Sequence, residues 1–221
     1  MDDERLRAMR EEYAAVGLAE SAAGDDPVAL FDRWLADAVN AGVHEPNAMA
    51  LATATPNGRP SVRLVLLKGA DARGFVFFTN TESRKGAELA ANPYAALAMT
   101  WHEVQRQVRI EGPVHRLSPA EDDAYFASRP RGSQLGAVAS PQSQVVPDRG
   151  WLEDRYAEVD RAHPDAEPVP RPAGWGGYRV QPQVVEFWHG RRGRMHDRLR
   201  FTRTDADIAS GAGWSRHRLA P

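Results

Sequence analysis

The sequence predicts an α+β fold built on an antiparallel, barrel-like sheet, and three observations lead to this prediction. Short β-type runs follow one another with a few helices inserted, rather than alternating with helices one for one. Turn signals such as Pro-Asn-Gly at 56–58 separate the runs. Neither a GxGxxG fingerprint nor a Walker loop is present, so we do not expect a nucleotide or flavin to lie in a Rossmann crevice.

Length and composition favour one compact domain spanning residues 1–221. The chain has 42% hydrophobic and 26% charged residues, which is typical of a globular protein with a sizeable core. The formal net charge of -2 gives no reason to expect binding to nucleic acid or to a membrane surface, so any anion site must be local. The absence of cysteine excludes disulfides, thiolate metal sites and a cysteine nucleophile.

The first residues, MDDERLRAMREEY, are charged throughout and lack the apolar stretch of a secretory signal. No run elsewhere approaches the ~18 apolar residues of a spanning helix. We therefore expect a cytoplasmic protein.

Two helices are expected near the amino terminus, over residues 4–15 and 28–41. In the second, apolar residues from Leu30 to Val39 recur at the spacing of one helical face, and Pro27 suits a first turn. The Ala-Gly-Asp-Asp segment before Pro27 is expected to be a loop.

Three β-type runs follow, at 48–55, 61–68 and 74–80, separated by turn signals. Because they are consecutive and short, we expect them to form an antiparallel meander. Further strands are expected at 94–101 and 105–117, with a helix over about 82–91 placed before them.

The second half of the chain is expected to begin with helices over 119–138 and 148–162. The proline-rich stretch 163–172 is expected to be a connector because proline cannot join a strand ladder. Strands then resume, at 177–181, at 184–190, near 194–201, and in a last strand before the carboxyl terminus.

The first candidate site is Ser83-Arg84-Lys85, at the expected start of the helix over 82–91. Two cations at a helix amino terminus are disfavoured by a few tenths of a kcal/mol, roughly, unless an anion joins them. A phosphate bound by the helix end, both cations and the hydroxyls of Thr79 and Ser83 would resolve this conflict. The alternative is two solvated surface cations.

The second candidate is the run from Arg63 to Lys68, in which two cations bracket an otherwise apolar strand that we expect to be buried. The two cations have opposite parity along a strand. For both to reach one ligand, the strand must bulge or end near Lys68. The alternative is that both lie at strand ends and reach water.

The third candidate is the segment Arg194-Met195-His196-Asp197-Arg198. If it is extended, Arg194, His196 and Arg198 share one face, which suits a ligand with negative charge and ring acceptors. A solvated edge strand that uses charge to deter aggregation is the alternative.

The fourth candidate is Tyr125, Arg129 and Ser133, spaced four residues apart. Pro130 favours a helix break between them, with Ser128 as a cap for a second helix, and the trio can converge at that junction. No hydrolase triad, carboxylate pair or metal signature is recognisable in the sequence. A site of Arg, Lys, Tyr, Ser and His binds anions and leaves the chemistry to a cofactor.

Nine motifs of the sequence together resemble the pyridoxamine 5'-phosphate oxidase family. The resemblance runs in order from about residue 5 to residue 221, and RMHDR combined with RPRGSQ is specific to that family. The motifs are RLVLLK, FFTNTESRKG, RQVRIEG, YFASRPRGSQLGA, SPQS, WGGYRV, EFWHG, RMHDR and the terminal RLAP.

The resemblance implies an FMN-binding split β-barrel with peripheral helices, assembled as a homodimer with FMN at the subunit interface. Within the single domain 1–221, residues 1–45 would form a helical amino-terminal segment that acts as a lid, and 174–221 the strands that complete the substrate site. The implied reaction oxidises pyridoxamine 5'-phosphate and pyridoxine 5'-phosphate to pyridoxal 5'-phosphate. Dioxygen is the acceptor and hydrogen peroxide the product, with ammonia released from the amine.

The resemblance also assigns site residues. The implied FMN contacts are Arg63, Leu64, Val65, Leu66, Leu67, Lys68, Phe78, Thr79, Arg84, Lys85, Gln107, Gln142, Ser143, Trp188 and Arg198. The implied substrate contacts are Lys68, Tyr125, Arg129 and Ser133 around the phosphate, Arg194, Met195 and His196 at the pyridine ring, and Arg10 and Tyr13 from the lid. Arg194 and His196 would be the catalytic pair, which orients the ring and its C4' substituent.

Two separate cationic clusters agree with two phosphate monoesters, one on FMN and one on the substrate. The sequence departs from the family pattern at Glu11 and Glu45 and carries extra arginines at 191 and 192, which leaves the details of the lid and nearby site walls open. Two other functions remain open. One is another split-barrel oxidoreductase that uses FMN or a deazaflavin, and the other is a non-catalytic binder of FMN or pyridoxal phosphate.

Overall fold

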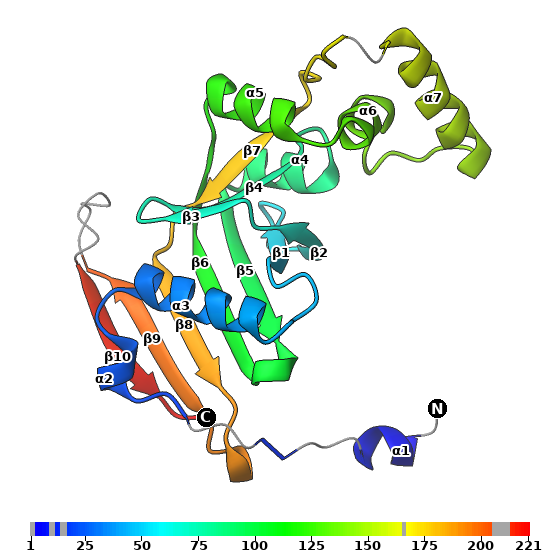
Figure 1. Cartoon of the computed structure of the whole chain (residues 1–221). Coiled ribbons are helices and arrows are strands. Elements are labelled where there is room, and N and C mark those ends of the chain that lie inside the picture. The colour runs from blue at the N-terminus through cyan, green and yellow to red at the C-terminus, as the bar shows by residue number, and fades with distance from the viewer. Residues whose placement is uncertain (1–2, 9–11, 14–16, 165–166, 205–212) are drawn as a thin grey trace.

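The computed structural model describes residues 3–8, 12–13, 17–164, 167–204 and 213–221. One long helix lies across a curled sheet, and the last two helices of the chain pack on each other beyond one end of that sheet (Figure 1). The helices are α1 (Asp3–Ala8), α2 (Glu20–Ala23), α3 (Pro27–Asn40), α4 (Arg84–Ala91), α5 (Pro119–Ser128), α6 (Arg131–Ala139) and α7 (Arg149–Ala162). Short 3-10 turns, η1 (His102–Val104) and η2 (Arg192–Arg194), precede β6 and β9.

The sheet is antiparallel, and its main path runs in the order β10-β9-β8-β6-β5-β1-β2. The strands are β1 (Ala48–Ala54), β2 (Pro60–Leu66), β3 (Gly69–Asp71), β4 (Gly74–Asn80), β5 (Tyr94–Trp101), β6 (Arg106–Arg116), β7 (Trp175–Val180), β8 (Val184–His189), β9 (Asp197–Arg203) and β10 (Trp214–Leu219). The long strand β6 pairs with β8 along its first part and with β7 at its end, so it joins both halves of the sheet. This arrangement is a split barrel, as predicted.

The helix predicted at 28–41 is confirmed as α3. The Asp26 side chain accepts a hydrogen bond from the Val28 N–H, and Pro27 occupies the first turn. The helix predicted at 4–15 is shorter in the structure. It ends at Ala8, and Glu12 and Tyr13 are not helical, whereas 9–11 and 14–16 lie outside the described residues.

The predicted three-strand meander is wrong. β1 pairs with β2, but β4 pairs with β3 and β7 rather than with β2. The short strand β3 was missed, and it turns back into β4 where Asp71 accepts hydrogen bonds from the N–H groups of Arg73 and Gly74. Gly74 has a φ of 136°, and a Cβ there would lie 2.1 Å from the Val180 carbonyl oxygen, so the turn requires glycine.

The main core lies between α3 and the sheet. Phe31 is fully buried and meets Phe75 of β4 edge to face at 4.9 Å between ring centroids, while Trp34 meets Phe187 of β8 at 5.2 Å. A second cluster, which includes Phe126, Leu135 and Trp175, fixes α5 and α6 against β7. None of the helices in the described ranges combines the length and the apolar character needed to cross a lipid bilayer.

The run 61–68 was predicted to be a buried strand, and in the single chain this is wrong. Val62, Leu64 and Leu66 are 68%, 75% and 38% exposed. β2 ends the main path of the sheet, and these side chains share the face of the sheet opposite the core. The structure therefore has an exposed apolar patch along β2.

The helical stretch predicted at 119–138 is two helices, α5 and α6, broken at Pro130. Ser118 caps α5 through a capping box with Glu121. Ser128 does not cap α6, because its hydroxyl donates to the Tyr125 carbonyl oxygen and Pro130 occupies the cap position. The helix predicted at 148–162 is confirmed as α7, with Asp148 at its cap.

We expect Phe31→Ala to reduce the free energy of unfolding by about 3–5 kcal/mol, because it empties the contact between α3 and β4. Urea unfolding followed by tryptophan fluorescence measures the change. Val39→Ala, on the exposed side of the same helix, is the control and should cost less than about 1 kcal/mol. Equal losses in the two variants would contradict the assignment of the core face.

Candidate functional site

Two adjoining cavities lie between the end of β2, strand β4 and the α5–α6 junction. Their volumes are about 310 and 500 Å³. Both are lined by Phe78, Arg129, Ser133 and Trp175, so they share a wall. A ligand in one cavity would therefore lie beside a ligand in the other.

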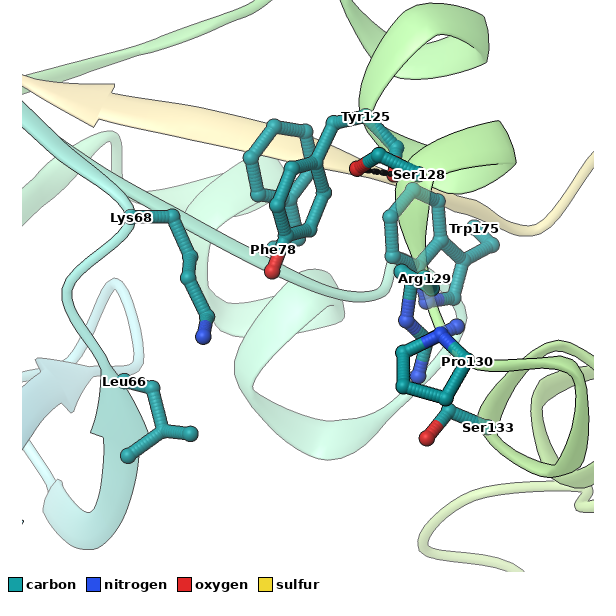
Figure 2. Close-up of a pocket in the computed structure, with 9 residues that line it drawn as sticks. All are labelled: Leu66, Lys68, Phe78, Tyr125, Ser128, Arg129, Pro130, Ser133 and Trp175. Carbon is teal, nitrogen blue, oxygen red and sulfur yellow. Dashed lines mark hydrogen bonds between the residues drawn. The ribbon is translucent and has the colours of Figure 1, made fainter.

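The smaller cavity brings together all four residues that were predicted to bind the substrate phosphate. Lys68, Tyr125, Arg129 and Ser133 all line it. Figure 2 shows the Lys68 ammonium and the Tyr125 hydroxyl directed into the space beside Leu66, with Arg129 and Ser133 across from them. Residues from three elements thus supply hydrogen-bond donors to one space.

Lys68 reaches this cavity because the strand stops before it. β2 ends at Leu66, and the Lys68 N–H donates to the Val76 carbonyl oxygen of β4 at 2.8 Å. The alternation of side chains along β2 therefore no longer governs Lys68. The strand thus ends near Lys68, as a ligand shared with Arg63 would require, but Arg63 lines the larger cavity and Lys68 the smaller one.

Arg129 is a cation held against aromatic rings. Its guanidinium carbon lies 5.0 Å from the ring centroid of Trp175 and 5.6 Å from that of Phe126. Burial lowers the pKa of Arg129 from its ordinary value. The buried Nη1 has no hydrogen-bond partner in the described part of the chain, which leaves a donor at the shared wall for an anion.

A stack of three rings forms the shared wall. Phe78 lies parallel to Tyr125 at 4.0 Å and to Trp175 at 5.3 Å between centroids. Sequence reasoning missed Trp175, although a tryptophan directly before the predicted strand at 177–181 was a usable signal. The stack gives both cavities a flat apolar side, which suits planar ring systems.

Lys85 is the central cation of the larger cavity. It is buried, and its Nζ donates to Thr79 Oγ1 at 3.0 Å, to Ser83 Oγ at 3.1 Å and to Gln142 Oε1 at 2.6 Å. Burial and the positive charge of Arg63 lower the pKa of Lys85 from 10.5 to about 8. These three neutral oxygens do not balance its charge, so the site is suited to an anion.

Arg63 also lines the larger cavity, together with the predicted residues Leu64, Val65, Phe78, Thr79 and Gln142. Its Nη1 donates to the Leu51 carbonyl oxygen at 3.1 Å and to Thr53 Oγ1 at 2.6 Å, and its Nη2 lies 3.3 Å from Glu88 Oε2. The cation therefore approaches the cavity from strand β2 with a buried carboxylate behind it.

Three residues predicted at this site do not line the larger cavity. The Ser83 hydroxyl donates to the Asn80 carbonyl oxygen at 2.6 Å and is fully buried, so it does not line the cavity. Arg84 is 62% exposed and pairs with Glu88, which lies four residues farther along the same helix. Leu67 belongs to the main core.

Ser143 does not line either cavity. It is exposed in a turn with a φ of 72°, next to Gln142, which does line the larger cavity. The predicted contact of Gln142 with FMN fits its position in the larger cavity. The predicted contact of Ser143 with FMN does not fit the position of Ser143 in the single chain.

A second group of predicted residues lies at the β8–β9 turn. Gln107, Trp188 and Arg198 are paired in register across β6, β8 and β9, so their side chains share one face. The ring of Trp188 lies 4.7 Å from that of His196 and 5.6 Å from that of Tyr13. We call Tyr13, Gln107, Trp188, Arg194, His196 and Arg198 the hairpin group.

The predicted extended face of Arg194, His196 and Arg198 is wrong. β9 begins at Asp197, and the chain before it is the turn η2, in which Gly193 and Arg194 have φ values of 62° and 61°. The left-handed turn cancels the two-residue alternation. Met195 is 69% exposed.

His196 nevertheless has a defined orientation. Its Nδ1 accepts a hydrogen bond from the Arg191 N–H at 3.0 Å, so the neutral ring carries its proton on Nε2. Its ring also packs at 5.6 Å against that of Tyr13. Tyr13 of the amino-terminal segment therefore lies against the predicted catalytic residue His196, whereas Arg10 lies outside the described residues.

Arg198 is already paired. Its Nε donates to Glu186 Oε1 at 2.9 Å and its Nη1 to the Ala220 carbonyl oxygen at 3.0 Å. Next to it, Asp197 accepts the Leu18 N–H at 2.9 Å and Arg218 Nη1 at 2.5 Å, while Arg218 Nη2 donates to the Leu18 carbonyl oxygen at 2.9 Å. These contacts fix Leu18 beside the hairpin group.

The hairpin group and the cavities do not meet within one chain. Neither cavity is lined by a residue of the hairpin group. The β8–β9 turn lies at the opposite end of the sheet from α5 and α6 (Figure 1). The structure thus places the predicted phosphate-binding residues and the predicted catalytic pair in two separate places.

Comparison with protein families gives two matches along the chain. Residues 35–162 match a model described as "Pyridoxamine 5'-phosphate oxidase". Residues 175–221 match one described as "Pyridoxine 5'-phosphate oxidase C-terminal dimerisation region".

Individual relatives agree with these matches. A pyridoxine/pyridoxamine 5'-phosphate oxidase of Rubrobacter xylanophilus is 56% identical over 98% of this chain and 96% of its own length. The crystal structure of PhzG from Burkholderia lata in complex with tetrahydrophenazine-1-carboxylic acid is 34% identical, with a TM-score of 0.85 over 95% of this chain and all of that one. An FMN-binding protein from Nostoc punctiforme is 19% identical, with a TM-score of 0.68 over 86% of this chain and 97% of that one, and shares the fold.

The lowered pKa of Lys85 predicts that phosphate binding weakens above pH 8. Lys85 then loses its charge in the free protein, so an anion must draw a proton back, and affinity falls by up to about tenfold per pH unit. The measurement is the rise in Tm produced by inorganic phosphate at pH 7.5 and 9.5, against chloride at equal ionic strength. The rise should shrink at the higher pH in the wild type and persist in Lys85→Arg. An equal rise at both pH values in the wild type would refute the role of Lys85.

Proposed function

The chain belongs to the pyridoxamine 5'-phosphate oxidase family, and from this premise we propose that it is an FMN-dependent oxidase of vitamin B6 phosphates. It converts pyridoxamine 5'-phosphate and pyridoxine 5'-phosphate to pyridoxal 5'-phosphate, with dioxygen as acceptor and hydrogen peroxide as product. The observation that carries the proposal is the pair of adjoining cationic cavities with one aromatic wall.

The two cavities suit two phosphate monoesters. In the larger one, Arg63, Lys85, Thr79 and Gln142 would hold the phosphate of FMN. In the smaller one, Lys68, Tyr125, Arg129 and Ser133 would hold the phosphate of the substrate. Fixed donors of this kind suit phosphate oxygens, and arginine adds bidentate geometry.

Two observations support the fit of FMN to these residues. Lys85 is a buried cation whose Nζ donates to three neutral oxygens, and Arg129 keeps a buried donor without a partner in the described ranges. Each is costly until an anion joins it. When bound, FMN would supply the capacity to take two electrons from the substrate and pass them to dioxygen.

The protein residues then position and polarise. The cluster around the substrate phosphate fixes the register of the pyridine ring. Arg194 and His196 orient the ring and its C4' substituent, with the Nε2 proton of His196 available as a donor. Loss of either residue costs rate through misplacement of the reacting atoms.

We propose that a complete site needs two copies of the chain. The hairpin group lies far from the cavities of its own chain. The apolar patch on β2, formed by Val62, Leu64 and Leu66, is exposed. A homodimer would cover this patch and bring the hairpin group of one copy to the cavities of the other. The match of residues 175–221 to a dimerisation region supports this arrangement.

Within this site, residues 1–45 would act as a lid and 174–221 would complete the substrate pocket. The contacts of Tyr13 with Trp188 and His196 support the first assignment. The position of Trp175 in the shared wall supports the second.

One experiment tests the function. The purified protein should be yellow, and with pyridoxine 5'-phosphate or pyridoxamine 5'-phosphate it should yield peroxide and pyridoxal 5'-phosphate. A yellow protein that turns over neither substrate would instead favour an oxidase of other substrates. The related PhzG structure is a complex with tetrahydrophenazine-1-carboxylic acid, which is one compound to include in that test. Tight binding of FMN without any turnover of candidate substrates would favour a carrier.

We expect Arg194→Ala and His196→Ala to lower kcat by roughly 10- to 1000-fold while FMN stays bound, because these residues act on the substrate. Absorbance spectra give the FMN content and a peroxide assay gives kcat. Arg192→Ala, in the same turn, is the control for disturbance of the loop. Loss of flavin from both substituted proteins would show that the assignment to the substrate is wrong.

Mixing two inactive variants should restore activity if the site is shared between chains. Arg129→Ala disables the cavities and His196→Ala disables the hairpin group, so a mixed dimer retains one intact site. The variants are unfolded and refolded together, and their activity is compared with that of each variant refolded alone. Activity no higher in the mixture than in either variant alone would contradict a site shared between chains.

A further inference from the structure

Glu88 is a buried carboxylate behind the larger cavity, and no motif of the sequence drew attention to it. We propose that Glu88 is a positioning residue that sets the guanidinium group of Arg63 for the phosphate of the flavin. The proposal rests on the FMN site proposed above and adds a residue that does not itself touch the ligand.

Both carboxylate oxygens of Glu88 are occupied. Oε2 accepts hydrogen bonds from Thr53 Oγ1 and Ser61 Oγ, each at 2.5 Å, and lies 3.3 Å from Arg63 Nη2. Oε1 accepts from Arg84 Nε at 2.9 Å. Glu88 thereby joins α4 to strands β1 and β2 at one point.

The burial of Glu88 makes these contacts specific. Its side chain is only 5% exposed, whereas most carboxylates in this protein that pair with arginine are far more open. Burial alone would raise the pKa of Glu88, but its hydrogen bonds from Ser61, Thr53 and Arg84 outweigh that effect and lower the pKa to about 2. The side chain is thus a fixed negative charge at neutral pH.

Arg63 depends on this charge for its direction. Its other acceptors are the carbonyl oxygens of Leu51 and Ser61 and the hydroxyls of Thr53 and Ser61, and both hydroxyls also bond to Glu88. Glu88 and Arg63 therefore share one hydrogen-bond network. Without the carboxylate, both hydroxyls can reorient. The guanidinium group of Arg63 then also loses its charged partner on the side that faces away from the cavity.

The local charge also matches the ligand. Arg63, Arg84 and Lys85 are three cations in close range, and Glu88 reduces their sum to two positive charges. A phosphate monoester carries about -1.5 to -2 at neutral pH. Glu88 thus limits the repulsion between these cations in the free protein while leaving enough charge to balance the phosphate.

Charge and geometry predict opposite effects for Glu88→Gln. By Coulomb's law alone, removal of a negative charge near a phosphate strengthens binding. If Glu88 acts by positioning, binding weakens because Arg63 no longer presents its donors in a fixed direction. The sign of the change in affinity therefore tests the proposal.

The experiment compares FMN with riboflavin, which has the same ring system and no phosphate. Dissociation constants for the full-length apoprotein are measured by quenching of flavin fluorescence. For Glu88→Gln we expect the Kd for FMN to rise by about tenfold or more and that for riboflavin to change less than about twofold. Glu158→Gln, which removes an exposed carboxylate paired with an arginine on α7, is the matched control and should leave both values unchanged.

Two further variants separate positioning from misfolding. Circular dichroism and Tm check the fold, and Ser61→Ala, a milder change in the same network, should raise the FMN Kd in the same direction. In an Arg63→Ala background, Glu88→Gln should cost less than it does alone, because the two residues act as a unit. If the losses of FMN affinity in Arg63→Ala and Glu88→Gln are additive, the two residues act independently, and Glu88 does not position Arg63.

The outcome also separates this proposal from the proposed function. An FMN Kd that is unchanged or lower in Glu88→Gln, or an equal loss for riboflavin, overturns the positioning role. A wild-type protein that binds FMN but forms no pyridoxal 5'-phosphate overturns the oxidase function and leaves the role of Glu88 standing. A wild-type protein with no affinity for FMN overturns both.

Discussion

The site depends on buried positive charge that the protein itself does not neutralise. The Lys85 ammonium meets three neutral oxygens, and the Arg129 guanidinium lies against the rings of Trp175 and Phe126. Such groups reduce the stability of the folded chain until an anion binds. The break at Pro130 lies next to Arg129 and the aromatic rings, and the early end of β2 lets Lys68 enter the adjoining cavity.

Elements with strong periodicity were predicted well from sequence. The apolar face of α3 and the capping and proline signals at its start gave its position within one residue. The proline between Arg129 and Ser133 offered a junction where Tyr125, Arg129 and Ser133 can converge, whereas their grouping with Lys68 around a phosphate came from the family resemblance. Most of the flavin residues came from the family resemblance, since spacing alone left a surface role open for Arg84 and Lys85.

The remaining features depend on tertiary contacts that a local pattern does not contain. Arg84 turns to Glu88, and Ser83 turns to the Asn80 carbonyl oxygen, so only Lys85 of that motif reaches the cavity. β4 pairs with β3 and β7, and the long strand β6 pairs with β8 and then with β7. The left-handed turn at Gly193 and Arg194 was hidden because arginine rarely adopts a positive φ.

The peptide at Leu18 is fastened on both sides by residues from near the end of the sequence, its N–H by Asp197 and its carbonyl by Arg218. Gly17 permits this approach, since a Cβ there would lie 2.7 Å from Asp197 Oδ2. Leu18, near the amino terminus, is therefore held by the same contacts that join β9 and β10 near the carboxyl terminus. A fusion or an affinity tag that separates β10 from β9 would also disturb the contact of Arg218 with Leu18. A change made at the carboxyl terminus would therefore affect residues near the amino terminus.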